Sequence, residues 1–161
     1  MEYSQTYIDL MITSLKEKTD ILKELITLSK KQGECIRGRR VDTPAYEEIY
    51  QQKDKLIETL SDADAGFEKL YGRVREELDQ NRQTYREQIR QMQQQIQEIT
   101  DLGVQLQAIE LRNKDAMEQY LKGEREAIRQ FHHNNKASSL YYRNMSNHAY
   151  SDEAVFYDQK K

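Results

Sequence analysis

Residues 85–120 read YREQIRQMQQQIQEITDLGVQLQAIELRNKDAMEQY, and their periodicity is the strongest structural signal in the chain. Long side chains return every three or four residues, which places them on one stripe of an α-helix. The stripe consists of Tyr85, Ile89, Met92, Ile96, Ile99, Leu102, Leu106, Ile109, Asn113, Ala116 and Tyr120. We expect one helix over about 82–134. Two successive steps of three residues beside Gly103 form a stammer, which overwinds a coiled coil and predicts a bend.

Two more amphipathic helices are predicted before this one, over about 4–37 and 43–79. The first carries a stripe of Ile8, Ile12, Leu15, Leu22 and Ile26. The second has a well-marked start, because Thr43 can cap a helix and Pro44 is tolerated in a first turn. Its stripe consists of Ala45, Ile49, Leu56, Leu60, Ala63, Phe67, Leu70, Val74 and Leu78. The stripe continues through Gly66 and Gly72, so we expect one helix that allows a kink, with Asn81 as a cap for the third helix.

The predicted fold class is all-α, an elongated antiparallel three-helix coiled coil or bundle over residues 1–135. At about 1.5 Å per residue the third helix reaches roughly 80 Å, so this very long helix extends beyond both of its partners. Residues 136–161 form an irregular aromatic C-terminal tail without a helical period. The lack of a helical period is consistent with partial disorder of the tail. Its aromatic residues favour a role in binding instead, because disordered segments are usually poor in them.

Composition excludes several classes of function. The net charge is only −3, which argues against a nucleic-acid partner. No run of about 18 apolar residues is present, so we expect no membrane insertion. A single cysteine, Cys35, suits a reducing compartment, and the predicted localisation is cytoplasmic.

No catalytic, cofactor-binding or metal-binding set emerges from the sequence, and an enzyme is not expected. The only histidines are His132, His133 and His148, and none follows a Glu-x-x-His spacing. Cys35 has no neighbouring base to activate it. The glycine-containing stretch 33–40 lacks the Lys and Ser/Thr of a phosphate-binding loop, and a helix end explains it better.

Asn113 is the one amide on the apolar stripe of the third helix. A buried asparagine can fix the register or the oligomeric state of a coiled coil. The same residue can also lie at the edge of the stripe and face water. The sequence leaves both alternatives open.

The chain resembles the FlgN/FliT-like flagellar export chaperones in four segments. They are Ile21–Leu28 in the first helix, Gln52–Glu58 in the second, Ile109–Asp115 in the third, and an aromatic tail with Tyr141–Asn144 and Phe156–Asp158. The likeness spans nearly the whole chain. Gln52 and Asp115 depart from the residues more usual in the family, which affects the identity of the cargo more than the class.

The resemblance implies a cytoplasmic chaperone that binds amphipathic C-terminal helices of hook–filament junction proteins before type III export. Filament cap protein is the other cargo that the resemblance allows, and the export apparatus is a further partner. Aromatic residues outside a core favour protein interfaces, and packing of the tail against its own bundle is the alternative. We therefore expect the cargo to bind the overhanging end of the third helix and the tail, at Met117, Tyr120, Leu121, Ile128, Phe131, Leu140, Tyr141, Tyr142, Val155 and Phe156.

A structural coiled-coil protein that self-associates through the same stripes is the alternative function. Periodicity does not distinguish helices packed within one chain from helices packed across two, so a homodimer stays open.

Overall fold

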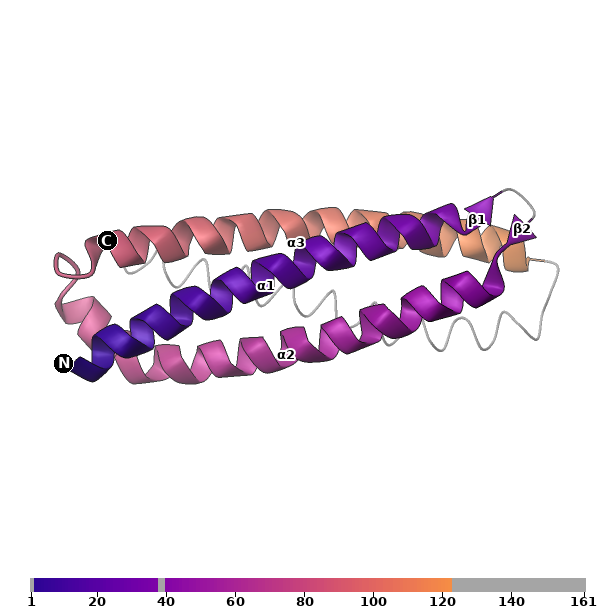
Figure 1. Ribbon diagram of the computed structural model, residues 1–161. Coiled ribbons are helices and arrows are strands. Elements are labelled where there is room, and N and C mark those ends of the chain that lie inside the picture. Colours follow the sequence, from indigo (N-terminus) through magenta and orange to yellow (C-terminus); the bar gives the residue numbers. More distant parts are fainter. Residues whose placement is uncertain (1, 38–39, 123–161) are drawn as a thin grey trace.

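The computed structural model describes residues 2–37 and 40–122, which form three long helices and one short hairpin (Figure 1). The elements are α1 (Glu2–Glu34), β1 (Ile36–Arg37), β2 (Arg40–Val41), α2 (Thr43–Gln80) and α3 (Arg86–Leu121). The prediction of an all-α chain with three helices is confirmed, apart from the two-residue strands.

The connection between α1 and α2 is an antiparallel hairpin rather than a simple turn. Ile36 pairs with Val41 and Arg37 with Arg40. The amide of Asp42 also donates to the carbonyl of Cys35 at 3.0 Å, which closes the base of the hairpin. The first helix therefore ends at Glu34, three residues before its predicted end.

Helix α2 starts where the sequence indicates, but a different residue caps it. Asp42 is the N-cap, and its carboxylate accepts from the amide of Ala45 at 3.2 Å. Thr43 is instead the first helical residue, followed by Pro44, whose missing N–H costs nothing in a first turn. The helix continues without a break through Gly66 and Gly72.

Helix α3 begins four residues later than predicted. Residues 81–85 form a turn, and Asn81 caps the C-terminus of α2 instead of starting α3. Tyr85 occupies the N-cap position without a side-chain capping bond. Helix α3 passes through Gly103 without interruption and is described as far as Leu121, so the predicted continuation to residue 134 and the tail lie outside the described residues.

Helix α1 is the shared partner of the other two helices. In Figure 1, α2 and α3 lie on opposite sides of α1, with α2 running antiparallel to both. Both pack along α1, whereas the backbones of α2 and α3 stay largely apart from each other. The open side between α2 and α3 is therefore bridged by side chains.

Buried side chains recur every seven residues along each helix. On α2 the row is Tyr46, Lys53, Leu60, Phe67 and Val74. A spacing of seven residues corresponds to two turns of a coiled coil, so each row stays on the core side along the whole helix. The matching row on α1 is Ile8, Leu15, Leu22 and Ser29, and that on α3 is Met92, Ile99, Leu106 and Asn113.

Candidate functional site

The buried apolar side chains divide into two separate clusters. The larger cluster, which we call the main core, extends along all three helices as far as Ile26, Leu60 and Ile109. The smaller one, the end cluster, consists of Tyr46, Met117 and Leu121. Cys35, Ile36, Val41 and Tyr120 are partly buried and pack against the end cluster. It lies beside the hairpin, at the end of the bundle where α3 is last described.

Three of the predicted cargo-binding residues come together in this end cluster. Met117 and Leu121 are only 4% and 6% exposed, and Tyr120 is half-buried beside them. All three lie at the end of α3, where Met117 and Leu121 are buried side chains and not part of an open surface. The other seven lie outside the described residues, namely Ile128, Phe131, Leu140, Tyr141, Tyr142, Val155 and Phe156.

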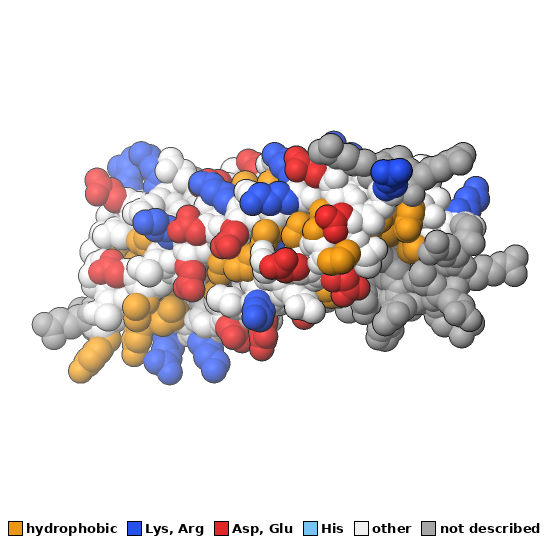
Figure 2. Space-filling view, turned by 45° about the vertical axis from the view of Figure 1, so that its right-hand side comes forward, with side chains coloured by type: hydrophobic (Ala, Val, Ile, Leu, Met, Phe, Trp, Pro, Cys, Tyr) orange, Lys and Arg blue, Asp and Glu red, His pale blue; other side chains and the backbone are white. Residues whose placement is uncertain are grey.

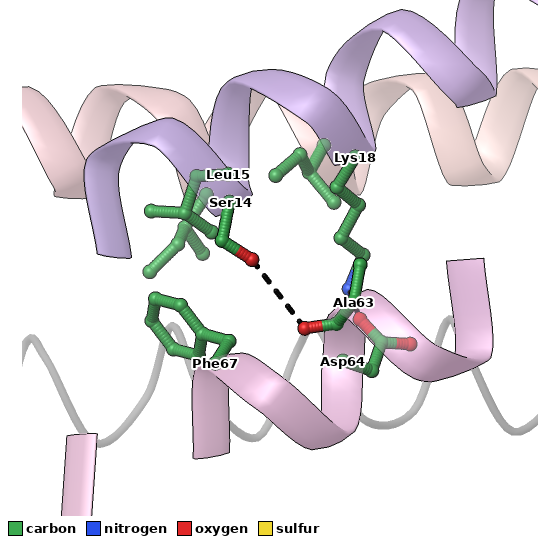
Figure 3. Close-up of a pocket in the computed structure, with 8 residues that line it drawn as sticks. Ser14, Leu15, Lys18, Ala63, Asp64 and Phe67 are labelled. Atoms are coloured by element: carbon green, nitrogen blue, oxygen red, sulfur yellow. Dashed lines mark hydrogen bonds and ion pairs between the residues drawn. The ribbon is translucent and has the colours of Figure 1, made fainter. Parts of the chain in front are cut away.

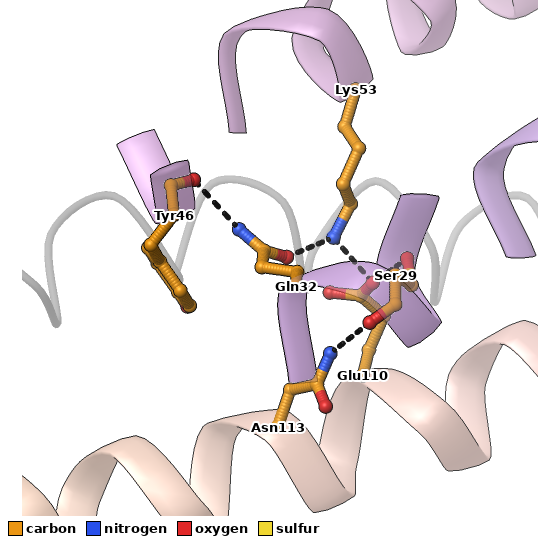
Figure 4. Close-up of polar contacts among 6 residues, drawn as sticks. All are labelled: Ser29, Gln32, Tyr46, Lys53, Glu110 and Asn113. Carbon is orange, nitrogen blue, oxygen red and sulfur yellow. Dashed lines mark hydrogen bonds and ion pairs between the residues drawn. The ribbon is translucent and has the colours of Figure 1, made fainter. Parts of the chain in front are cut away.

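A set of polar side chains separates the main core from the end cluster (Figure 4). This polar layer consists of Ser29 and Gln32 on α1, Lys53 on α2, and Glu110 and Asn113 on α3. The ammonium of Lys53 donates to Gln32 Oε1 at 2.7 Å and to Glu110 Oε1 at 2.5 Å. Ser29 Oγ donates to the same Glu110 oxygen. One carboxylate thus accepts from α1 and α2 together.

The remaining bonds of the polar layer reach main-chain carbonyls. Gln32 Nε2 donates to the carbonyl of Tyr46 at 3.4 Å, which links the layer to the end cluster. Asn113 Nδ2 donates to the carbonyl of Ser29 at 2.7 Å. Asn113 is only 8% exposed, so the structure selects its buried position from the two alternatives that the sequence left open.

Burial changes the titration of two residues in this region. Desolvation lowers the pKa of Lys53, and the neighbouring Glu110 carboxylate opposes part of this shift. Burial also raises the pKa of Tyr46 well above its ordinary value, with Glu110 adding to the effect. A buried cation therefore depends on a single carboxylate partner, which makes the polar layer sensitive to the loss of either group.

Neither Lys53 nor Glu110 was predicted from the sequence to lie in the interior. A lysine in an amphipathic helix usually faces solvent, and the predicted stripe of the second helix passed through Ile49 and Leu56 instead. Both of these residues are half-buried, and the fully buried row lies between them. The seven-residue spacing of Lys53 from Tyr46 and from Leu60 was the signal that could have placed it inside.

A second buried ion pair lies nearer the middle of the bundle (Figure 3). Lys18 is almost fully buried, and its ammonium lies 2.5 Å from Asp64 Oδ1. Ser14 Oγ donates to the carbonyl of Ala63 at 3.4 Å beside it. The adjoining cavity is closed by Phe67 and has room for about one water molecule, so it does not suit a larger ligand.

Cys35 has the environment of a poorly reactive thiol. Partial burial raises its pKa, and the nearby carboxylates of Asp42 and Glu34 raise it further. Its thiol lies 3.4 Å from the carbonyl of Lys31. Within residues 2–37 and 40–122, no group of three or more His, Cys, Asp or Glu side chains is arranged to hold a metal ion. In the same part of the chain, no helix is long and apolar enough to cross a membrane.

The outer surface carries charges of both signs with small apolar groups between them. Figure 2 shows positive and negative side chains interspersed over one face, and hydrophobic side chains visible among them. Among the residues that the structure describes, the exposed large apolar side chains form two pairs, each spaced by seven residues. They are Tyr3 with Leu10 on α1, and Val104 with Leu111 on α3.

Comparison with known proteins gives one match. A family model described as FlgN protein matches residues 1–148, which is most of the chain. No curated protein and no solved structure matches the sequence.

Proposed function

Because this chain belongs to the FlgN family of flagellar export chaperones, we propose that it binds the amphipathic C-terminal helices of hook–filament junction proteins before type III export. The proposed place of action is the cytoplasm, and the export apparatus is the proposed second partner. Binding is stoichiometric and involves no covalent chemistry. The filament cap protein is the competing cargo.

The observation that carries this proposal is the gathering of Met117, Tyr120 and Leu121 in one apolar cluster at the end of α3. An amphipathic helix binds by laying its apolar face into an apolar groove or against an apolar platform. In the proposed arrangement, the end cluster forms the inner part of the platform. Residues 123–161, which hold the other seven candidates, start directly after it.

Co-purification with the C-terminal halves of the two junction proteins tests the function, with mass measured by light scattering. A soluble 1:1 complex supports the proposal and identifies the cargo. Binding to the cap protein alone would replace the junction proteins as cargo. Absence of binding to all three proteins would refute the proposed function.

A matched pair of substitutions tests the surface. Tyr120→Ala removes a half-buried aromatic side chain beside the end cluster, and we expect cargo affinity to fall about tenfold, as for a moderate hot spot. Leu111→Ala removes an exposed apolar side chain from the same helix, outside the cluster. We expect cargo affinity to stay unchanged in this control. Equal effects of the two substitutions would contradict the proposed surface.

Self-association is the second candidate function. The exposed pairs Tyr3 with Leu10 and Val104 with Leu111 favour it, because apolar residues spaced by seven can form a coiled-coil seam. A stable dimer of the chain alone, lost in a Val104→Ser/Leu111→Ser variant, would support this function. A monomer at all accessible concentrations would exclude it.

A further inference from the structure

All three helices become polar at the same level of the bundle. Along the seven-residue rows, Leu22 is followed by Ser29 on α1, and Leu106 by Asn113 on α3. On α2, which runs in the opposite direction, Leu60 is preceded by Lys53. The polar layer therefore crosses the whole bundle and does not interrupt only one helix.

The two sides of the polar layer differ in how many apolar side chains they bury. The main core is a continuous set of apolar contacts from Ile8 to Ile26 on α1, and across α2 and α3. Among the described residues, the buried apolar side chains of the end cluster are Tyr46, Met117 and Leu121. Among the described residues, hydrogen bonds and one ion pair hold the layer together, and Gln32 links it to the carbonyl of Tyr46 in the end cluster. Water can satisfy these polar groups when they separate.

A polar layer of this kind weakens the coupling between the packing on its two sides. Cooperative units in proteins follow contiguous apolar contacts, and regions with few such contacts open at lower free energy. Burial of Lys53 lowers the free energy of opening further, because a desolvated cation regains its hydration when the layer opens. Opening at the hairpin end therefore leaves the main core intact.

We propose that the end of the bundle beyond the polar layer opens and closes as one unit while the main core stays folded, and that this opening controls access to the end cluster. The unit comprises the last residues of α1, the hairpin, the start of α2 and the end of α3. Its use in cargo binding rests on the proposed function. The separate opening rests only on the division of the core.

Hydrogen exchange of the full chain, followed by mass spectrometry, tests the separate opening. We expect amides of residues 46–50 and 114–121 to share one opening free energy and to exchange at least about tenfold faster than those of 60–74 and 92–106. The opposite end of the bundle is an internal control, because Leu78 and Tyr85 belong to the main core. Equal protection at both ends, or a gradual decrease along each helix, would overturn the proposal.

A variant in which apolar residues replace most of the polar layer tests whether the layer causes the separate opening. We combine Ser29→Ala, Gln32→Leu, Lys53→Met and Glu110→Leu, and keep Asn113 because its partner is a main-chain carbonyl. We expect the exchange of residues 46–50 and 114–121 to slow by about tenfold, toward that of the main core. An unchanged ratio between the two regions would overturn the proposal. If this variant does not fold, the comparison within the native chain decides.

A charge-matched control variant is available between α1 and α3. Lys23 and Glu98 form an ion pair 3.3 Å apart, and both side chains are about half exposed. Lys23→Met with Glu98→Leu removes one cation and one anion without changing the layer, so the two regions should keep their exchange ratio.

We also expect cargo to associate about tenfold more slowly with the apolar-layer variant, because access to the end cluster requires opening. If the end unit opens separately but the chain binds no cargo, the proposed function is refuted and the proposal of separate opening stands.

Discussion

Asn113 of α3 lies so close to Gly33 of α1 that a β-carbon on residue 33 would be 2.5 Å from Asn113 Oδ1. The same amide group donates to the carbonyl of Ser29 at 2.7 Å. The absence of a side chain at Gly33 thus allows the asparagine to reach the backbone of the neighbouring helix. Glycine is present here for close approach between helices, and not for a special backbone conformation.

Gly33→Ala should destabilise the protein, although alanine is the better helix former. The new methyl group displaces the Asn113 amide and breaks its bond to Ser29, and we expect a net loss of about 1 kcal/mol. Urea unfolding followed by circular dichroism measures this change. Gly66→Ala and Gly72→Ala are matched controls, since nothing lies within 4 Å of either added β-carbon. Each control should gain up to about 1 kcal/mol. Stabilisation by all three substitutions would contradict the role of Gly33.

Lys53→Met should lower the free energy of unfolding by about 2–4 kcal/mol, because the buried part of Glu110 loses its cation. Adding Glu110→Leu and Gln32→Leu removes the two acceptors that lose the Lys53 ammonium, so the triple variant should recover most of the loss. Urea unfolding of both variants provides the comparison. A triple variant that is less stable than Lys53→Met would show that the ion pair itself stabilises the fold.

Alkylation of Cys35 should be slower in the folded chain than in the unfolded chain. Its pKa is raised above 9.0 in the folded state, so less of the reactive thiolate is present at pH 8. We expect iodoacetamide to react with the native protein at least about threefold more slowly than with the same protein unfolded in urea. The effect of urea on the reaction itself is measured with a small thiol and corrected for. Equal rates would contradict the raised pKa.

The same shift predicts how Cys35 affects stability at alkaline pH. The folded state holds the thiol proton more tightly than the unfolded state, so this contribution is fully present below pH 9.0 and is lost as the pH rises through the folded pKa. Cys35→Ser should therefore lose less stability than the native chain as the pH rises above 9.0. Parallel stability profiles for the two proteins would exclude this contribution.

Deletion of residues 136–161 should reduce cargo affinity by about tenfold or more, since five of the proposed contact residues are removed. Isothermal titration with the purified junction-protein C-terminal halves measures the affinity. The unfolding of the main core should change little, which circular dichroism can check. Unchanged affinity would remove the tail from the proposed surface and leave the end cluster as the remaining candidate.

The periodicity of the sequence was sufficient to predict three helices, because apolar stripes and helix breakers are local signals. The hairpin at Ile36–Val41 was not predicted, since its strands are only two residues long. The cap of α2 was placed one residue too late, because Asp42 and Thr43 are both good capping residues and only geometry distinguishes them.

The polar layer was only partly predictable. Asn113 was recognised because it interrupts a stripe, whereas Lys53 and Glu110 look like ordinary surface charges until their helices are packed. Lys53 lies in one of the segments that carry the family resemblance, and Glu110 and Asn113 lie in another. These two segments, which are far apart in the sequence, meet in the structure. Part of the resemblance therefore reflects how the helices pack, and not only how the cargo is bound.

The position of α1 between the other helices also determines when the fold can be completed during synthesis. Ser29 is bonded to Glu110, a residue 81 positions later in the chain, so the partners of the first helix are made at very different times. The α1–α2 hairpin can form early, but half of the surface of α1 stays exposed until α3 has left the ribosome. Such long-range pairing slows folding relative to helical proteins built from local contacts. A chaperone of this design thus has its own interval of exposed apolar surface before it can protect another protein.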